Sequence, residues 1–452
     1  MTNGQTSSVS GNDESKPPRT NEPGASATPE PRILLDFLFS LGQAYLAGGE
    51  QTAQVELTLR RVAAAYGMRR SAVVAFPTAI FVRISDGTSE HVDLAPGPGR
   101  NLRLDQIAEV YTLGAAAQRG EVVPELGLQR LNAIMREPAR FGALGSIVGH
   151  TILTVGVAML LVPAVESLLY AAALGAIIGV VKLLKGNQPV FAVPLPVVAA
   201  AIVSGLVFSL VRYGYGLEPF HVLVPPLVTF LPGMMLTMGM VELAYGDMVS
   251  GSARLISGFV QLVLLAFGLA AGAMVVGMSS GFGADAIPLV DPMPWVPWLG
   301  VLVFGVGVSM HFSAPRRSLP WMLLVMFAAF AAQQLGTRAF GSETSGFWGA
   351  LLATPLSYLI QLRFNGPPAM VTFLPSFWVL VPGALGLLSV KRMLTDRAAG
   401  IDGLVTVVFV IASIALGTLM GAALYKWISE SFGSWQLRMG RADPKGRGAP
   451  KE

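Results

Sequence analysis

Cysteine is absent from this sequence of 452 residues, and histidine occurs only four times. Without cysteine the chain can form no disulfide bond, thiol nucleophile or thiolate metal site, although this does not fix its redox compartment. We expect no metal site and no cofactor. The N-terminus also lacks a basic start followed by an apolar core, so we expect no cleavable signal peptide.

Charge is scarce as well, because Asp, Glu, Lys and Arg make up 13% of the residues, against about 25% in an ordinary soluble protein. The formal net charge of +4 comes without an aromatic-interleaved basic patch, which argues against a nucleic-acid partner. The shortage is greatest between Gly142 and Ser429, where long apolar runs alternate with short polar breaks. Runs of about 18 residues or more match the thickness of a bilayer core. The sequence therefore predicts a polytopic α-helical membrane protein.

The region before the apolar runs has an ordinary soluble composition. Residues 1–31 are polar and rich in Ser, Pro, Asn and Glu, which predicts a disordered tail. Residues 33–140 are expected to form a small cytosolic α+β domain of two helices, a β-meander and two further helices. Helical spacing of Leu34, Leu38 and Leu41 and alternation of Ile80, Val82 and Ile84 indicate these elements.

Ten transmembrane helices are expected after this domain. They are placed at about 142–162, 164–184, 189–211, 219–241, 253–278, 296–312, 319–336, 345–364, 368–390 and 402–427. We group them as two five-helix repeats, residues 142–278 and 294–427, followed by a basic C-terminal tail, 430–452. Five is an odd number, so the second repeat would enter the bilayer in the inverted orientation.

Lysine and arginine indicate the orientation. The basic tail, together with Arg136 and Arg140 before the first span, favours two cytoplasmic termini. Lys182 and Lys185 are then counted in a cytoplasmic loop. The expected location is the plasma (inner) membrane, crossed several times.

Proline interrupts the fourth and ninth expected spans in the same way. Pro225 and Pro232-Gly233 recur at an offset of 150 residues as Pro375 and Pro382-Gly383. Proline removes a backbone donor, so each span is expected to kink or break twice. Such breaks inside a bilayer need protein or a water-filled cavity around them, and a matched pair points to a transporter binding site. The alternative is a pair of kinked packing helices without a ligand.

Ionisable residues near the spans are candidates for proton coupling or gating, because charge inside a membrane marks ion or substrate paths. They are His150, Glu242, Asp247, Arg254 and Arg392. Each of three has a structural alternative: His150 as a packing residue, Asp247 as a helix N-cap and Arg392 as a snorkelling side chain.

Several stretches resemble the threonine/serine exporter family. They are Tyr45–Glu56, Leu59–Ala63, Pro232–Thr237, Leu243–Leu255, Phe373–Pro375 and Leu380–Gly383. The resemblance covers about residues 33–427. It implies a secondary active transporter that exports threonine and serine and is driven by the proton motive force. Family residues carry over to Pro232, Gly233, Thr237, Gly246, Asp247, Ser250, Gly251 and Arg254.

A zwitterionic amino acid needs backbone donors for its carboxylate and an acid or carbonyls for its ammonium. The substrate-binding candidates are Thr229, Pro232, Gly233, Thr237, Pro382 and Gly383, with Thr229 or Thr237 reading a substrate hydroxyl. The expected partners are a small amino acid, protons and the lipid bilayer, and a homo-oligomer is an option. We interpret the chain as a transporter and not an enzyme. Two alternatives stay open: a membrane-anchored hydrolase with catalysis in residues 33–140, and a passive small-solute channel.

Overall fold

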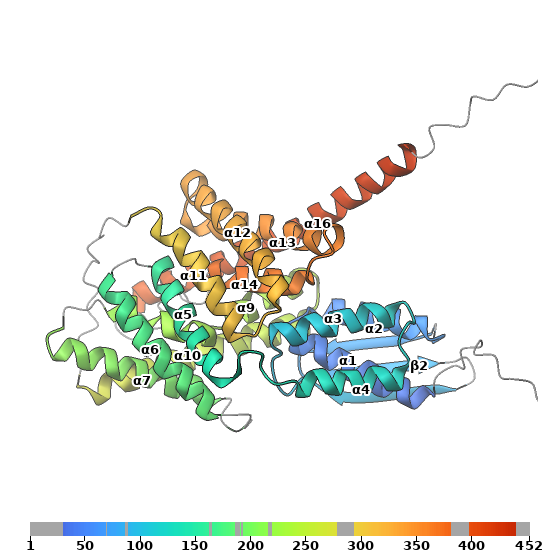
Figure 1. Ribbon diagram of the computed structural model, residues 1–452, viewed down its shortest axis with the longest axis horizontal. Helices are drawn as coiled ribbons and strands as arrows, with labels where there is room; N and C mark the ends of the chain where they lie inside the picture. Colours follow the sequence, from blue (N-terminus) through green and yellow to red (C-terminus); the bar gives the residue numbers. More distant parts are fainter. Residues whose placement is uncertain are drawn as a thin grey trace, which may run out of the picture.

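The computed structural model describes residues 30–68, 70–85, 89–161, 165–185, 190, 193–215, 219–277, 293–380 and 397–439. Pro382, Gly383 and Arg392 lie outside the described residues, as do most of the two tails. The described part is mostly helical and contains one small sheet (Figure 1).

The N-terminal elements follow the predicted order. Helices α1 (Pro31–Ala47) and α2 (Thr52–Ala65) precede β1 (Ala72–Phe76), β2 (Ala79–Ser85) and β3 (Glu90–Pro96), and α3 (Leu104–Gln118) and α4 (Pro124–Arg136) follow. The strands form an antiparallel sheet in the order β1-β2-β3. In β2, Ile80, Val82 and Ile84 are buried and the residues between them are not. These apolar side chains therefore form the core with helix α1, which packs on β2 and β3. Hereafter this unit is the N-terminal domain.

The membrane part begins at α5. The first half contains α5 (Gly142–Leu161), α6 (Val165–Lys185), α7 (Pro194–Arg212), α8 (Pro219–Leu223), the 3₁₀ helix η2 (Pro225–Phe230), α9 (Gly233–Ala244) and α10 (Met248–Val275). The second half contains α11 (Val296–His311), η3 (Arg316–Ser318), α12 (Leu319–Phe340), η4 (Ser342–Thr344), α13 (Ser345–Arg363), α14 (Ala369–Leu380) and α16 (Arg397–Met439).

Six helices in the described part are long and apolar enough to cross a membrane, where ten spans were expected. They lie at 142–161, 167–184, 194–212, 248–275, 316–340 and 402–428. Three of the expected spans are missing from this set because their helices are too short. Helix α11 has 16 residues, and α9 and α14 have 12 each, whereas a perpendicular span needs about 20. The chain is thus a multi-pass membrane protein, and ten helices are not established by these elements.

Proline acts differently in the two interrupted segments. In the first half, the expected span 219–241 is divided into α8, η2 and α9. In the second half, α14 continues as an α-helix through Pro375. Of the kink or break that we expected at Pro375, the break is therefore absent, since a membrane helix tolerates an interior proline where neighbouring groups satisfy the freed backbone.

Close packing joins the two halves along α5 and α11, which contact each other extensively. Glycines on both helices let the backbones approach until a Cβ atom would collide with the partner helix. Four such contacts are Gly149 with Met310, Gly156 with Phe304, Gly300 with Met159 and Gly307 with Leu153. We call these eight residues the glycine seam. Helix α7 packs along α10, and α13 packs along α16.

The N-terminal domain docks against one end of the membrane helices (Figure 1). Helix α3 contacts α14, and the backbone N–H of Leu104 donates to the carbonyl of Phe312, at 3.0 Å. The loop between α1 and α2 reaches α9 and α10 through the contacts described below.

Candidate functional site

The broken segment of the first half is enclosed by protein. Pro225 and Pro226 begin η2, and Pro232 separates it from α9, which starts at Gly233. Where a helix is broken, some backbone carbonyls lose their helical N–H donors, and inside a membrane these carbonyls need donors from elsewhere in the protein. The carbonyl of Phe230 has one, because the side-chain amide of Gln261 donates to it at 2.6 Å. The break is therefore a packed feature, and η2 contacts α5, α6 and α7.

A group of polar side chains gathers at this break. The Lys182 ammonium on α6 donates to the hydroxyl of Thr229 on η2 at 2.9 Å, and it lies 2.9 Å from Nε2 of His311 on α11. On its other side, the Thr229 hydroxyl lies 3.3 Å from Nε2 of His150 on α5. We call Lys182, Thr229, His150 and His311 the polar cluster. It joins four elements through consecutive hydrogen bonds.

Two backbone carbonyls determine how the histidines are protonated. Nδ1 of His150 lies 3.0 Å from the carbonyl of Gly175, and Nδ1 of His311 lies 2.9 Å from that of Ser146. A carbonyl only accepts, so each Nδ1 carries the proton and donates. In the neutral rings Nε2 is then an acceptor, which suits the ammonium of Lys182 and the hydroxyl of Thr229. The ammonium also lies 5.2 Å from the centre of the Phe230 ring, within cation–π range.

A second polar contact joins α9 to the N-terminal domain. Glu242 is 1% exposed, and its Oε1 accepts the backbone N–H of Thr52 at 3.1 Å and the Thr52 hydroxyl at 3.3 Å. Its Oε2 lies 3.0 Å from Nε of Arg254 on α10. Arg254 in turn donates to the carbonyl of Glu50 at 3.0 Å. Thr52 is the first residue of α2, where N–H groups lack helical partners. Glu242 therefore acts as a carboxylate cap for a helix of another domain.

Of the remaining candidates, Asp247 occupies the N-cap position of α10 without a side-chain capping bond. Thr237 is fully buried, and its hydroxyl donates to the carbonyl of Gly233 in its own helix at 3.0 Å. Pro232 and Gly233 begin α9. The structure thus brings His150 to Thr229, and Glu242 to Arg254. Asp247 contacts Glu242 through its backbone, because its N–H donates to the Glu242 carbonyl at 2.9 Å.

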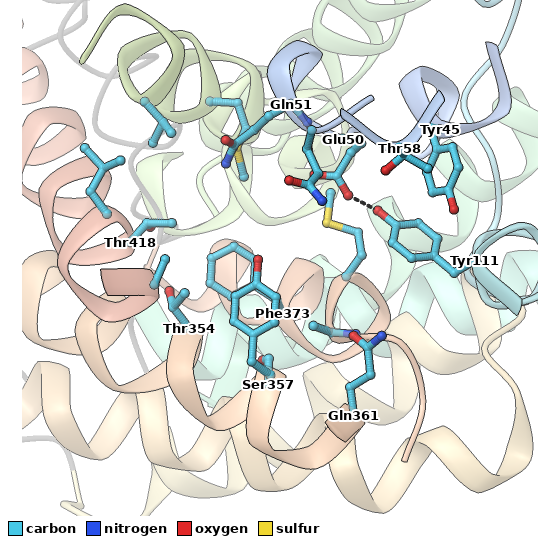
Figure 2. Close-up of a pocket in the computed structure, with 18 of the residues that line it drawn as sticks. Tyr45, Glu50, Gln51, Thr58, Tyr111, Thr354, Ser357, Gln361, Phe373 and Thr418 are labelled. Atoms are coloured by element: carbon cyan, nitrogen blue, oxygen red, sulfur yellow. Dashed lines mark hydrogen bonds between the residues drawn. The ribbon is translucent and has the colours of Figure 1, made fainter. Parts of the chain in front are cut away.

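A cavity of about 240 Å³ lies between the N-terminal domain and four membrane helices (Figure 2). We call it the interdomain cavity. Polar residues of both parts line it: Tyr45, Glu50, Gln51, Gln54, Thr58, Arg61, Tyr111, Gln118, Tyr245, Thr354, Ser357, Tyr358, Gln361 and Thr418. The four substrate candidates of the first half, Thr229, Pro232, Gly233 and Thr237, do not belong to its lining.

Glu50 is the carboxylate of this cavity. The Tyr111 hydroxyl donates to its Oε2, and the backbone N–H of Gln51 donates to its Oε1 at 3.1 Å. Burial raises the pKa of Glu50, and this effect is opposed by the hydrogen bond from Tyr111, that from Gln51 and the charge of Arg254. Burial, followed by the neighbouring Glu50, raises the pKa of Tyr111 well above its ordinary value. Tyr111 therefore remains a donor at physiological pH.

Sequence reasoning missed Lys182, His311 and Glu50. Lys182 lies at the end of an apolar run and was counted as a loop residue. His311 lies at the end of the sixth expected span. Three of the four histidines, His150, His221 and His311, fall within expected spans, and this was a usable signal. Among the described residues, no group of three or more His, Asp or Glu side chains is placed to hold a metal ion.

Comparison with known proteins gives one family match and several relatives. The model of the family described as "Putative threonine/serine exporter" matches residues 36–276. This range contains the N-terminal domain from the first turns of α1 onward, the broken segment and both Glu242 and Arg254. No solved structure matches.

The relatives include fungal proteins and a bacterial protein. "Pheromone-regulated membrane protein 10" of Candida glabrata is 27% identical over 162 residues, which are 35% of this chain and 20% of that protein. Its Saccharomyces cerevisiae namesake is 25% identical over 35% of this chain and 42% of its own length. The chain thus covers less than half of these fungal relatives. The "Probable threonine/serine exporter" of Mycobacterium tuberculosis is 24% identical over 415 residues, 88% of this chain and 77% of the relative.

Proposed function

The chain belongs to the threonine/serine exporter family, and from this premise we propose that it exports small amino acids such as threonine and serine. In this proposal it is a secondary active transporter of the plasma membrane, driven by the proton motive force. Ten helices cross the bilayer and both termini are cytoplasmic. The N-terminal domain then faces the compartment that supplies the substrate.

The observation that carries the proposal is the polar cluster at the broken segment. A cationic side chain among packed membrane helices is costly, and such groups are usually functional. Lys182 and Thr229 connect α6 to η2, so the ionisable groups and the break form one unit. A kinked packing helix would need neither the lysine nor the two histidines.

The cluster can couple proton binding to movement. In the arrangement described, Nε2 of His311 accepts from Lys182. A proton added to this nitrogen would turn the acceptor into a cationic donor, facing an ammonium at 2.9 Å. Like charges at that separation repel strongly, because the effective dielectric constant among packed helices is lower than in water. Either side chain must then move, and a movement of Lys182 releases Thr229 and with it η2.

Support for inverted repeats comes from the glycine seam. Gly149 and Gly300 are separated by the same 151 residues as Gly156 and Gly307. The contact partners are separated by the same 151 residues. Gly156 on α5 contacts Phe304 on α11, and its equivalent Gly307 on α11 contacts Leu153, the α5 equivalent of Phe304. Reciprocal contacts of this kind are expected across a two-fold axis. Along the seam the residue numbers rise on α5 while those of the contact partners on α11 fall, so the two helices are antiparallel. A two-fold axis that relates them runs perpendicular to both helices, as in an inverted repeat.

Flux measurements test the proposal. Full-length protein is reconstituted into liposomes loaded with labelled threonine, and a pH gradient of either sign is imposed. We expect efflux that saturates with threonine concentration and is accelerated by a pH gradient of one sign. The opposite gradient should leave the efflux rate unchanged or lower it, and a protonophore should abolish efflux. Protein-free liposomes are the control. Efflux that neither saturates nor responds to the gradient would indicate a channel, and no efflux of threonine or serine would contradict the proposal.

A further inference from the structure

We propose that the interdomain cavity is the site that binds the amino acid before export, with Glu50 as the partner of its ammonium group. This inference rests on the proposed function but assigns the substrate to a place different from the broken segment. It makes the N-terminal domain one half of the binding site. Pockets for small molecules often form between domains.

The size of the cavity fits a small amino acid. Its volume of about 240 Å³ equals that of about eight water molecules, at roughly 30 Å³ each in the liquid. Threonine has about as many non-hydrogen atoms.

One wall of the cavity consists of hydrogen-bond acceptors. The hydroxyls of Thr354, Ser357 and Thr418 each donate to a carbonyl in their own helix, at 2.8 to 2.9 Å. A hydroxyl whose proton is used in this way presents only its lone pairs to a ligand. These oxygens therefore suit a donor with several protons, and an ammonium group is such a donor.

Glu50 supplies the negative charge for that ammonium. Each carboxylate oxygen receives one hydrogen bond, from Tyr111 and from the backbone of Gln51, and each can accept one more. These bonds hold the carboxylate in one orientation. Figure 2 shows Glu50 and Gln51 on one side of the cavity, with Ser357 and Gln361 on the opposite side.

Donors for the carboxylate of the ligand come from side-chain amides. The carbonyl oxygen of Gln361 accepts the backbone N–H of Ala369 at 2.8 Å, which fixes the amide so that its NH₂ group is left to donate. Gln54, on the first turn of α2, contributes a second amide to the lining. The exposed side chain of Arg61 also belongs to the lining. The cavity therefore combines a carboxylate and acceptors with amide and guanidinium donors, the pattern that a zwitterion with a small hydroxylated side chain requires.

The position of α9 links this site to the broken segment. Met238 and Val241 of α9 line the cavity, and the same helix begins at Pro232 beside η2. The Gln51 amide lies 4.0 Å from the Met238 sulfur. A ligand in the cavity thus contacts α9, the helix that directly follows η2, and η2 carries Thr229 of the polar cluster.

Direct binding tests the inference. Purified full-length protein in nanodiscs is titrated with threonine by calorimetry at neutral pH. We expect Glu50→Gln to weaken threonine binding at least tenfold and Ser357→Ala to weaken it several-fold. Glu121→Gln is the matched control, because Glu121 is an exposed carboxylate of the same domain, paired with Arg119. It should bind threonine as the wild type does.

A ligand without the ammonium group separates the role of Glu50 from a general loss of structure. We expect 2,3-dihydroxybutanoate, which is threonine with a hydroxyl in place of the amine, to bind the wild type far more weakly than threonine. Glu50→Gln should not weaken it further. If Glu50→Gln does not fold, Ser357→Ala and Thr354→Val carry the test. Unchanged threonine affinity in the variants, with transport by the wild type intact, would overturn this site alone. A wild type that neither binds nor transports threonine would overturn the proposed function as well.

Discussion

Thr52 donates both its backbone N–H and its hydroxyl to a single carboxylate oxygen of Glu242, which lies 190 residues further along the chain. The donor begins a helix of the N-terminal domain, and the acceptor lies on the helix that follows the broken segment. Arg254 balances the charge of this buried carboxylate at 3.0 Å. A conformational change of α9 must therefore either carry the N-terminal domain with it or break these contacts.

Substitutions at this contact should weaken the docking of the N-terminal domain. Thr52→Val removes one hydroxyl donor and should cost about 1 kcal/mol. Glu242→Gln leaves Arg254 buried without its counter-charge and should cost about 3–5 kcal/mol. Thermal unfolding and hydrogen exchange of the first amides of α2 measure both effects. Thr112→Val is the control, because Thr112 is exposed and its hydroxyl bonds only to its own helix. Equal protection of α2 in Glu242→Gln and the wild type would contradict the role of the contact.

Much of the local structure could be predicted from short-range patterns. The alternation in β2 and the helical spacing in α1 depend on neighbouring residues, and both were predicted correctly. The break between η2 and α9 was predicted because proline restricts its own backbone. The continuous helix through Pro375 was not, since the tolerance of a proline in a membrane helix depends on the neighbouring groups that satisfy the freed backbone.

The polar contacts could not be predicted from sequence patterns. Lys182 and His311 are 129 residues apart, and Gln51 and Met238 are 187 apart. Their proximity follows from helix packing and from the docking of the N-terminal domain, neither of which leaves a periodic signal. Thr229 and His150 were chosen for their chemistry alone, and their contact at 3.3 Å was not anticipated.

Loss of Lys182 should separate transport from the proton gradient. We expect Lys182→Met to reduce gradient-driven threonine efflux at least tenfold, because the methionine can hold neither Thr229 nor His311. Exchange of labelled for unlabelled threonine, which needs no net proton movement, should be retained. Lys426→Met, at an exposed lysine of α16, is the control. Gradient-driven efflux at the wild-type rate in Lys182→Met would show that protons use another route.

Equivalent glycines of the seam should respond equally to substitution. In Gly156→Ala and Gly307→Ala the new methyl group meets the backbone of the partner helix, so each should destabilise the protein by about 1–3 kcal/mol. Gly205→Ala is the matched control on α7, where the nearest atom to an added Cβ lies 3.7 Å away. Melting temperatures in the same detergent compare the three variants. A large effect at only one of the two seam positions would argue against a two-fold relation between the halves.

Threonine affinity should rise with pH. Its ammonium binds the ionised form of Glu50, and burial raises the pKa of this carboxyl above its ordinary value of 4.5. Below that raised pKa a proton occupies Glu50, so the affinity should fall about tenfold for each further unit of pH. Above it, the affinity should be constant.

The other ionisable groups facing Glu50 keep one charge state between pH 5 and pH 8. They are the tyrosines Tyr45, Tyr111, Tyr245 and Tyr358 and the arginines Arg61 and Arg254, two residue types that in general titrate well above pH 8. Calorimetry across this range gives the affinity, and titration in buffers of different ionisation enthalpy counts the protons released on binding. We expect about half a proton released per threonine at the pKa of Glu50, up to one below it, and none in Glu50→Gln. An identical pH profile in Glu50→Gln and the wild type would mean that the ammonium is bound elsewhere.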